Sequence, residues 1–392
     1  MTETIAVLGS TGSVGTQALD VAAFHGIRVT AIAGGHNVRL LEEQVRHFRP
    51  ALCGVADEKA AEDLRVRIAD TGTRIVAGRD AAAQIAAEAD AQIAVNAVTG
   101  IAGLRPTLAA IESGKHVALA NKETMVAFGE QVMALAREKG VRILPVDSEH
   151  CAVFQCLQAN PGRAVRRILL TASGGPFFGK TKEELSRVTV AQTLAHPTWR
   201  MGRRITVDSA TLMNKGFEVI EAVRLFGVSP SQIEVVVHRE SIIHSMVEYI
   251  DRAVIAQMSV PDMRLCVQYA LSYPDRWESP LTPLDFPALG ALTFSSPDTD
   301  TFPLLALAFE AVGKGGVAPA VMNAADEVAV GAFLSGEISL PALTELVTRA
   351  VRTCTAASET LPTLAEVEAA DRETRGQVRE QLRRKEVLCG QS

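Results

Sequence analysis

Apolar runs alternate with helical patterns along the first 147 residues of the chain. The apolar runs are TIAVLG, RVTAIAG, QIAVNAV, HVALAN and VRILPV, each of which is typical of a strand buried on both faces of a sheet. Between them, residues 40–48, 81–89 and 104–112 are rich in alanine and leucine at helical spacing. Strands that alternate with helices predict a doubly wound α/β domain with a parallel sheet over residues 1–147.

The pattern changes over residues 148–274, where an α+β domain is predicted. QIEVVVH, SIIHSMVEYI and AVIAQMSV predict strands of a second, antiparallel sheet, and RRILLTASGGPF predicts a strand that ends in a glycine-rich loop. In DSATLMNKGFEVIEAVRLFG, apolar residues recur every three or four positions, which predicts one capped helix ending at Gly227. Residues 275–303 are rich in proline and predict a linker, and residues 304–392 predict a helical bundle whose charged last helix faces solvent.

Composition narrows the class of protein. The chain has 392 residues, of which 47% are hydrophobic and 21% charged, so it is globular and too long for a single core. The net charge is −6 without a long basic run, which argues against partners that are nucleic acids or anionic membranes. No stretch is apolar enough to span a bilayer, and no signal peptide is expected. The six cysteines lack metal or disulfide spacing, which fits the reducing cytoplasm.

Three glycines separate the first predicted strand from the first predicted helix. Gly9, Gly12 and Gly15 form G-x-x-G-x-x-G, a variant of the dinucleotide-binding fingerprint of Rossmann-like domains. Glycine at these positions lets a pyrophosphate approach the backbone at a helix N-terminus. The alternative is a tight structural turn without a ligand.

The end of the second predicted strand bears on which dinucleotide binds. An acidic residue usually meets a free ribose 2′-hydroxyl there, but this chain has Gly35, His36, Asn37 and Arg39. The absence of an acid favours NADPH over NADH. The alternative is that His36 and Arg39 are ordinary solvated loop residues.

A cluster of ionisable residues interrupts the apolar sequence at Asp147, Ser148, Glu149 and His150. One interpretation is a helix cap, in which Asp147 or Ser148 caps a helix beginning near Cys151. The other is a metal site, because Mg²⁺ and Mn²⁺ prefer carboxylate oxygens. In an extended segment Asp147 and Glu149 would face the same side.

A metal site of this kind needs a third carboxylate, and Glu218 is the best candidate. Asn214 and Lys215 precede it by four and three residues, so the three side chains can share one helix face. Glu221 is a weaker candidate. The alternative for Glu218 is a surface salt bridge to Lys215.

Three further segments carry small polar donors or aromatic residues. TASGGPF offers Ser173 beside a glycine pair, which is typical of an anion-binding nest. VDSATLMNKG offers Ser209 near a predicted helix start. AHPTWRMG, with His196 and Trp199, is a candidate lid or substrate contact, although Trp199 could instead pin this loop to the core.

Eight motifs in order carry a resemblance that covers nearly the whole chain: GSTGSVGTQALDV, LANKET, PVDSEHCAVFQCL, TASGGPF, HPTWRMG, VDSATLMNKGFEVIEA, SMVEY and VMNAADEVAV. With them the chain closely resembles the 1-deoxy-D-xylulose 5-phosphate reductoisomerase family of the methylerythritol phosphate route to isoprenoids. The resemblance implies a cytoplasmic, V-shaped homodimer with an NADPH-binding domain, a central catalytic and dimerisation domain, and a C-terminal helical domain.

The resemblance also implies site residues. It implies that the cofactor is bound by Thr11, Gly12, Ser13, Val14, Gly35, His36, Asn37, Asn121, Glu123 and Gly202. It implies that the metal is bound by Asp147, Glu149 and Glu218. It implies that the substrate is surrounded by Lys122, Ser148, Glu149, Ser173, His196, Ser209, Asn214, Lys215 and Glu218. Of these, catalytic roles are implied for Lys122, Asp147, Glu149, His196 and Glu218. The chain departs from the usual family residues at His36, Arg200 and Arg239.

The implied activity is a metal-dependent rearrangement of 1-deoxy-D-xylulose 5-phosphate, followed by NADPH reduction to 2-C-methyl-D-erythritol 4-phosphate. Mg²⁺, Mn²⁺ or Co²⁺ would serve as the metal. One alternative is a simple NADP-dependent dehydrogenase, which needs no divalent metal. Another is a non-catalytic NADPH-binding regulator, which has no reason to combine three carboxylates with a phosphate clamp.

Overall fold

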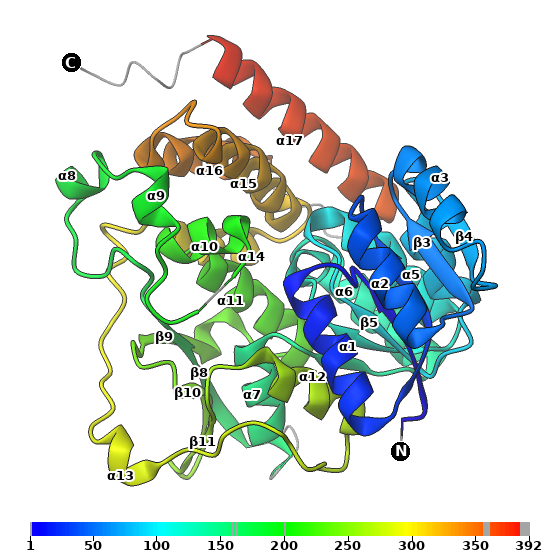
Figure 1. Ribbon diagram of the computed structural model, residues 1–392. Helices are drawn as coiled ribbons and strands as arrows, with labels where there is room; N and C mark the ends of the chain where they lie inside the picture. The colour runs from blue at the N-terminus through cyan, green and yellow to red at the C-terminus, as the bar shows by residue number, and fades with distance from the viewer. Residues whose placement is uncertain (1, 159, 161–163, 200, 356–360, 385–392) are drawn as a thin grey trace. The chain divides into compact units, whose positions relative to one another are not determined.

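The computed structural model describes residues 2–158, 160, 164–199, 201–355 and 361–384 (Figure 1), so Arg200 and Cys389 lie outside the described chain. Two compact units are present. The first comprises Met1–Thr124, Gln131–Cys151 and Asp262–Thr282, and the second comprises Met125–Glu130, Ala152–Pro261 and Pro283–Ser392. Residues 262–282 therefore pack with the N-terminal fold, whereas the predicted division places 262–274 in the catalytic domain. The predicted division into a cofactor-binding domain, a catalytic domain, a linker and a helical domain stays a prediction.

The first unit is built on a seven-stranded parallel sheet with the order β4-β3-β2-β1-β5-β6-β7. The chain winds outward from β1 to β4 and then starts again at β5 on the other side of β1, so the predicted doubly wound sheet is confirmed. The strands are β1 (Thr4–Leu8), β2 (Arg28–Gly34), β3 (Leu52–Val55), β4 (Arg74–Ala77), β5 (Ile93–Asn96), β6 (His116–Leu119) and β7 (Ile143–Pro145). The strand predictions did not include β3 and β4, which have four residues each.

The helices of the first unit are α1 (Ser13–His25), α2 (Val38–Phe48), α3 (Glu58–Arg67), α4 (Ala81–Glu88), α5 (Leu104–Glu112) and α12 (Met263–Ser272), with a short 3₁₀ helix at Gly100–Gly103. The helices predicted over residues 40–48, 81–89 and 104–112 correspond to three of these helices, whereas α3 and α12 were not predicted. Helix α4 packs beside α5, and the returning helix α12 packs beside α1. The Thr2 hydroxyl donates a hydrogen bond to the Leu271 carbonyl at 2.6 Å, which ties α12 to the first residues of the chain.

Two helices contribute residues to both units. Helix α6 (Lys122–Lys139) has non-helical backbone angles at Phe128, and its residues Met125–Glu130 belong to the second unit. Helix α7 (Ser148–Leu157) leaves the first unit after Cys151.

The second unit contains a four-stranded sheet with the order β11-β10-β8-β9. Its strands are β8 (Val165–Ala172), β9 (Ile233–Val237), β10 (Ile243–Tyr249) and β11 (Val254–Met258). Strand β10 runs antiparallel to β8 and β11, but β8 and β9 are parallel. The prediction of an antiparallel sheet was therefore wrong for this pair. Parallel pairing is possible because the long connection from β8 to β9 includes α8–α11 and can cross over.

The remaining helices belong to the second unit and are α8 (Lys182–Leu185), α9 (Val190–Thr193), α10 (Arg203–Ala210), α11 (Met213–Phe226), α13 (Phe286–Leu289), α14 (Leu304–Lys314), α15 (Ala318–Leu334), α16 (Leu340–Thr353) and α17 (Leu364–Arg384), with a 3₁₀ turn at Pro230–Gln232. The single helix predicted over 208–226 was wrong, because Leu212 has a φ of 59° and breaks it into α10 and α11. No described helix has the length and apolar character needed to cross a membrane.

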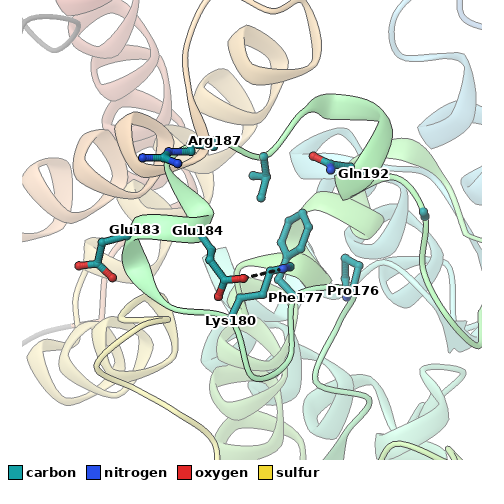
Figure 2. A pocket seen from close by; sticks show the side chains of 9 residues that line it. Pro176, Phe177, Lys180, Glu183, Glu184, Arg187 and Gln192 are labelled. Atoms are coloured by element: carbon teal, nitrogen blue, oxygen red, sulfur yellow. Dashed lines mark hydrogen bonds and ion pairs between the residues drawn. The ribbon is translucent and has the colours of Figure 1, made fainter.

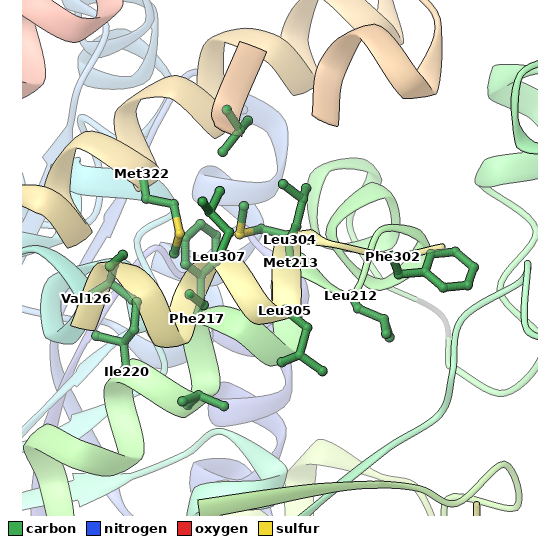
Figure 3. Close-up of a cluster of buried hydrophobic side chains, with 14 of the residues drawn as sticks. Val126, Leu212, Met213, Phe217, Ile220, Phe302, Leu304, Leu305, Leu307 and Met322 are labelled. Atoms are coloured by element: carbon green, nitrogen blue, oxygen red, sulfur yellow. The ribbon is translucent and has the colours of Figure 1, made fainter. Parts of the chain in front are cut away.

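One hydrophobic core holds α11 against the helices of the C-terminal bundle. Phe217 of α11 packs within a cluster that includes Leu304 and Leu307 of α14 and Met322 of α15 (Figure 3). Gly216 permits this close packing, since a Cβ there would lie 2.8 Å from the Ala308 methyl group. The bundle therefore fixes the helix that carries Asn214, Lys215 and Glu218.

Candidate functional site

The glycine loop after β1 leaves the start of α1 open to an anion. Gly9 has a φ of 81°, and a Cβ there would lie 2.4 Å from the Ala97 carbonyl oxygen. A Cβ at Gly15 would lie 2.1 Å from the Gly9 carbonyl oxygen, so neither position tolerates a side chain. Gly12 is the N-cap of α1, where no side-chain hydrogen bond caps the helix. Ser13 and Val14 form the uncapped first turn, whose N–H groups point toward the N-terminus.

The end of β2 lies beside this loop, as the cofactor prediction requires. A Cβ on Gly34 would lie 3.2 Å from Cγ2 of Thr11, so Thr11 packs on the β2 terminus. Asn37 caps α2 by accepting a hydrogen bond from the Leu40 N–H at 3.3 Å. In the turn between β2 and α2, Gly35 is half-buried and His36 is exposed. The turn therefore offers an imidazole and an amide and no carboxylate.

Asn121 and Glu123 brace the start of α6 against the loop after β5. Asn121 caps α6, and its Nδ2 donates hydrogen bonds to the Val98 and Gly100 carbonyls, both at 2.8 Å. Glu123 accepts a hydrogen bond from the Gly100 N–H at 3.1 Å. Both side chains are buried, so their described contacts hold the backbone at the carboxyl end of the sheet.

Asp147 is the centre of the carboxylate cluster in the first unit. Its two oxygens contact Lys122 Nζ at 2.8 Å and His150 Nδ1 at 3.0 Å. The side chains of Asp147 and Lys122 are each 10% exposed, and His150 is fully buried. The Ser148 hydroxyl donates to Glu149 Oε2 at 2.5 Å. The structure thus brings together the predicted residues Lys122, Asp147, Ser148 and Glu149.

The helix-cap and metal-site interpretations of this cluster are compatible. Asp147 Oδ1 accepts a hydrogen bond from the Glu149 N–H at 3.2 Å, directly before α7. The expectation that Asp147 and Glu149 lie in an extended segment was wrong, because Ser148 begins the helix and Glu149 is its second residue. Asp147 therefore caps α7 through Oδ1. Its carboxylate lies in a polar and nearly buried setting.

In the second unit, Ser173 and His196 form a hydrogen-bonded pair. Ser173 Oγ lies 3.0 Å from His196 Nε2. His196 Nδ1 accepts backbone hydrogen bonds from Thr198 at 3.2 Å and from Trp199 at 2.9 Å. Since Nδ1 is an acceptor, the proton of the neutral ring is on Nε2, which donates to Ser173. Burial lowers the pKa of His196, which favours this neutral form.

The Ser173 loop packs against the end of α10. Gly175 has a φ of 67°, and a Cβ there would lie 2.6 Å from the Ser209 carbonyl oxygen. Ser209 lies in the last turn of α10, and Gly202 is the N-cap of the same helix. Helix α10 therefore carries one predicted substrate residue and one predicted cofactor residue at its two ends.

A surface cavity of about 550 Å³ lies beside this loop but contains neither Ser173 nor His196 (Figure 2). It is lined by Pro176, Phe177, Lys180, Glu183, Glu184, Arg187, Val188, Gln192 and Ala195. Lys180 pairs with Glu184 at 3.0 Å on its wall. None of the residues predicted to bind the substrate lines this cavity, so it is not the predicted substrate site.

Glu218 is buried in α11 between two polar partners. Asn214 Nδ2 donates to Glu218 Oε1 at 2.6 Å, and Lys215 Nζ pairs with Glu218 Oε2. Lys215 and Glu218 are both buried, so the alternative of a surface salt bridge was wrong. The shared helix face predicted for these three residues is confirmed.

The helix start predicted near Ser209 needs a correction. Helix α11 begins at Met213, so Ser209 belongs to α10, and the left-handed residue Leu212 separates Ser209 from Asn214 and Lys215. Asn214 and Lys215 still lie in the first turn of a helix. The break was not visible in the sequence because Leu212 fits the helical hydrophobic pattern.

Two residues that hold the elements of the candidate sites in place were not identified from the sequence. Gln44 of α2 accepts a hydrogen bond from Ser10 Oγ at 2.7 Å and donates to the Ser10 carbonyl, so it holds the glycine loop. Arg204 of α10 contacts residues of α15. The partners are 34 residues apart in the first case and more than a hundred in the second, and no local pattern signals such contacts.

Comparisons with known proteins cover nearly the full chain. The family model described as 1-deoxy-D-xylulose 5-phosphate reductoisomerase matches residues 5–129, and models of the C-terminal domains of that enzyme match residues 143–226 and 258–377. The 1-deoxy-D-xylulose 5-phosphate reductoisomerase of Symbiobacterium thermophilum is 52% identical over 388 residues, which cover 97% of this chain and 99% of the relative. That of Caldanaerobacter subterraneus subsp. tengcongensis is 49% identical, with coverages of 95% and 97%.

Solved structures agree with the sequence relatives. The 1-deoxy-D-xylulose 5-phosphate reductoisomerase from Zymomonas mobilis in complex with NADPH has a TM-score of 0.90 and 40% identity, covering 97% of this chain and 99% of that one. A DOX-P reductoisomerase in complex with NADPH, fosmidomycin and magnesium has a TM-score of 0.91 and 35% identity, with coverages of 97% and 98%. The predicted fold class is confirmed, and the chain belongs to the 1-deoxy-D-xylulose 5-phosphate reductoisomerase family.

Proposed function

We propose that this chain is an NADPH-dependent reductoisomerase that converts 1-deoxy-D-xylulose 5-phosphate into 2-C-methyl-D-erythritol 4-phosphate. The observation that carries this proposal is the relationship at about 50% identity over nearly the whole of both chains. The simple dehydrogenase and the non-catalytic regulator have no support from these relatives.

The residues of the first unit fit NADPH. Gly9 and Gly15 leave room for a pyrophosphate, and the uncapped start of α1 offers N–H groups and a partial positive charge. Thr11, Gly12, Ser13 and Val14 would hold the pyrophosphate. Gly35, His36 and Asn37 would lie near the 2′-phosphate. We further propose that Asn121, Glu123 and Gly202 line the rest of the cofactor site.

The carboxylates fit a divalent cation by their chemistry. We propose that Asp147 and Glu149 of the first unit and Glu218 of the second unit bind one Mg²⁺, Mn²⁺ or Co²⁺ ion, as oxygen ligands that hard cations prefer. When bound, the ion would supply a Lewis acid for the oxygens of the substrate. Lys122 and His150 would hold Asp147 in place through their contacts at 2.8 and 3.0 Å.

The remaining predicted residues would bind and orient the substrate. Ser173, Ser209, Asn214 and Lys215 would hold its phosphate, since they supply hydroxyl, amide and ammonium donors. The His196 Nε2–H, which points at Ser173 Oγ, would donate to a substrate oxygen nearby. Ser148 and Lys122 would contact the carbon skeleton. The loop with His196 and Trp199 would exclude water from the reacting atoms.

We infer that the protein is a homodimer in the cytoplasm. In support of dimerisation, β11 is an edge strand, Val254 is 48% exposed on it, and Ile250 nearby is 69% exposed. Such an edge is available for pairing with a second chain. In support of a reducing compartment, the five described cysteines are free thiols. Light scattering at micromolar concentration tests the dimer, and a monomer mass would contradict it.

The activity is tested by following NADPH absorbance with 1-deoxy-D-xylulose 5-phosphate, with and without Mg²⁺. We expect substrate-dependent oxidation of NADPH that EDTA abolishes and added Mg²⁺ restores. The product should be the branched tetrol phosphate by mass and NMR. NADPH oxidation that persists in EDTA would identify a metal-independent dehydrogenase, and an absence of turnover with this substrate would reject the proposal.

A further inference from the structure

Arg204 is the centre of a network of charged side chains that lies within the second unit. It extends from α10. Arg204 Nη1 lies 3.0 Å from Glu327 Oε1, and its Nη2 lies 3.0 Å from Asn323 Oδ1 and 3.5 Å from Asp326 Oδ2. Its Nε lies 3.8 Å from Asp208 Oδ2 on its own helix. The guanidinium therefore joins α10 to three residues of α15.

The network continues from α15 to the C-terminal helix α17. Glu327 uses its second oxygen to accept a hydrogen bond from Arg375 Nη2 at 2.7 Å. Arg375 also pairs with Asp371, one turn earlier in α17, at 2.8 Å. Glu327 thus bridges the two guanidinium groups, and α17 is connected to α10 through α15.

The charged groups of this network are largely buried, so each of them depends on its partners. Asp326 is fully buried, and the side chains of Arg204, Glu327 and Arg375 are 16–18% exposed. Four carboxylates face two guanidinium groups, so removing either guanidinium leaves buried carboxylates without compensation. Burial and the nearby Asp208 carboxyl raise the pKa of Asp326, which is consistent with one acid of the group staying protonated.

The N-terminal half of helix α10 depends on contacts with other helices. Its N-cap residue, Gly202, makes no side-chain cap hydrogen bond, and the left-handed Leu212 separates its end from α11. It is eight residues long, about 12 Å at 1.5 Å per residue, and its residues 206–210 are buried whereas residues 203–205 are not, so the contacts of Arg204 hold its N-terminal half. Both Gly202 and Ser209 would move with it.

We propose that Arg204, through Glu327 and Arg375, is a positioning residue that fixes α10 and thereby places Ser209 for the substrate phosphate. The inference rests on the proposed function of Ser209. It assigns the C-terminal helix α17 a role in substrate binding, although no residue of α17 belongs to the proposed site. A site residue displaced by about 1 Å loses much of its binding contribution.

Three arginine-to-methionine variants test the proposal. Arg204→Met removes the centre of the network, and Arg375→Met removes the contact from α17 without touching α10. Arg384→Met is the matched control, because Arg384 belongs to the same helix as Arg375 and forms an exposed pair with Glu380 at 2.9 Å. Methionine keeps most of the length and apolar surface of the arginine side chain.

We expect Arg204→Met to raise the KM for 1-deoxy-D-xylulose 5-phosphate about tenfold, and Arg375→Met about threefold, within the range of couplings between neighbouring side chains. The value of kcat should change less than about twofold, because the displaced contact is to the phosphate and not to the reacting carbons. Arg384→Met should match the wild type. Lower melting temperatures with a KM equal to that of the control would show that the network only stabilises the fold.

A second readout does not depend on turnover. Amide hydrogen exchange of residues 203–210, measured by mass spectrometry, should be faster in Arg204→Met than in Arg384→Met. If the wild type fails to turn over the substrate, the proposed function fails, but this comparison still tests whether the network fixes α10. If Arg204→Met does not fold, Glu327→Gln removes the bridging charge with little change of shape and should show the same shift in KM and exchange. Equal exchange in network and control variants would overturn the proposal.

Discussion

His196 Nε2 lies 3.0 Å from Ser173 Oγ, and the other ring nitrogen of His196 accepts the backbone N–H groups of Thr198 and Trp199. One side chain therefore shapes its own loop through Nδ1 and reaches the glycine-rich loop after β8 through Nε2. These two tasks can be separated by substitution.

His196→Asn and His196→Gln divide the two contacts. The asparagine oxygen can occupy the place of Nδ1 and keep the turn at Thr198 and Trp199, whereas the glutamine amide reaches the place of Nε2. If Nε2–H serves the substrate, His196→Asn should lower kcat/KM more than His196→Gln does, by roughly tenfold for one lost hydrogen bond to a charged group. Steady-state kinetics with both variants measure this, and the reverse order would assign His196 to loop structure.

Glu149→Gln should abolish most of the activity and leave the fold intact. Glutamine keeps the size of the side chain but removes a charge that a divalent cation needs. Asp147 keeps its contacts with Lys122 and His150. We expect an unchanged melting temperature, normal NADPH binding by fluorescence, and a much higher Mg²⁺ requirement. Near wild-type turnover at ordinary Mg²⁺ would show that Glu149 only serves the start of α7.

Lys215→Ala should weaken kcat/KM for the phosphorylated substrate by about 2–4 kcal/mol, the cost of losing a charged donor. The structure adds a competing explanation, since Lys215 also pairs with the buried Glu218. Unphosphorylated 1-deoxy-D-xylulose separates the two. A phosphate contact predicts little change with this poor substrate, whereas an equal loss with both substrates would assign Lys215 to Glu218 and the metal.

NADPH should be used at least tenfold better than NADH. The turn after β2 contains Gly35, His36 and Asn37 and no carboxylate to bind a free 2′-hydroxyl. Each charge-assisted hydrogen bond to the 2′-phosphate should contribute about 1.5–3 kcal/mol. His36→Asp should reduce or reverse the preference. Equal kcat/KM values for the two cofactors in the wild type would contradict this prediction.

Asp326→Asn should stabilise the protein increasingly as pH rises. The pKa of Asp326 is raised well above its ordinary value of 3.8 by burial and by Asp208, so the folded state keeps a proton that the unfolded chain releases. The free energy of unfolding contributed by this group therefore falls as pH rises above 3.8, until the raised pKa is passed. Asparagine carries no such proton and still offers Arg204 an oxygen acceptor.

Thermal unfolding of both proteins between pH 5 and pH 8 measures this difference. The gain in melting temperature of the Asp326→Asn variant should be larger at pH 8 than at pH 5. A gain that is independent of pH would mean that Asp326 is ionised throughout, with Arg204 as its counter-ion.

Periodic patterns in the sequence determined most of the secondary structure of this protein. Strands such as β1 and β2 were predictable because burial of both faces gives a continuous apolar run. Helices such as α2, α4 and α5 were predictable because burial of one face imposes a repeat on the residues themselves. The glycine loop was equally predictable, since only glycine fits the contacts at Gly9 and Gly15. The shared face of Asn214, Lys215 and Glu218 followed from helical spacing alone.

Other features depend on residues that are distant in the sequence. The parallel pairing of β8 with β9, the return of residues 262–282 to the first unit, and the break at Leu212 leave no periodic signal. Arg204 reaches Asn323, which is 119 residues away, and His196 reaches Ser173 across 23 residues. Local spacing specifies which side chains share a face of one element, but only the packing of the whole chain decides which elements meet, because that choice depends on the total area and charge buried between them.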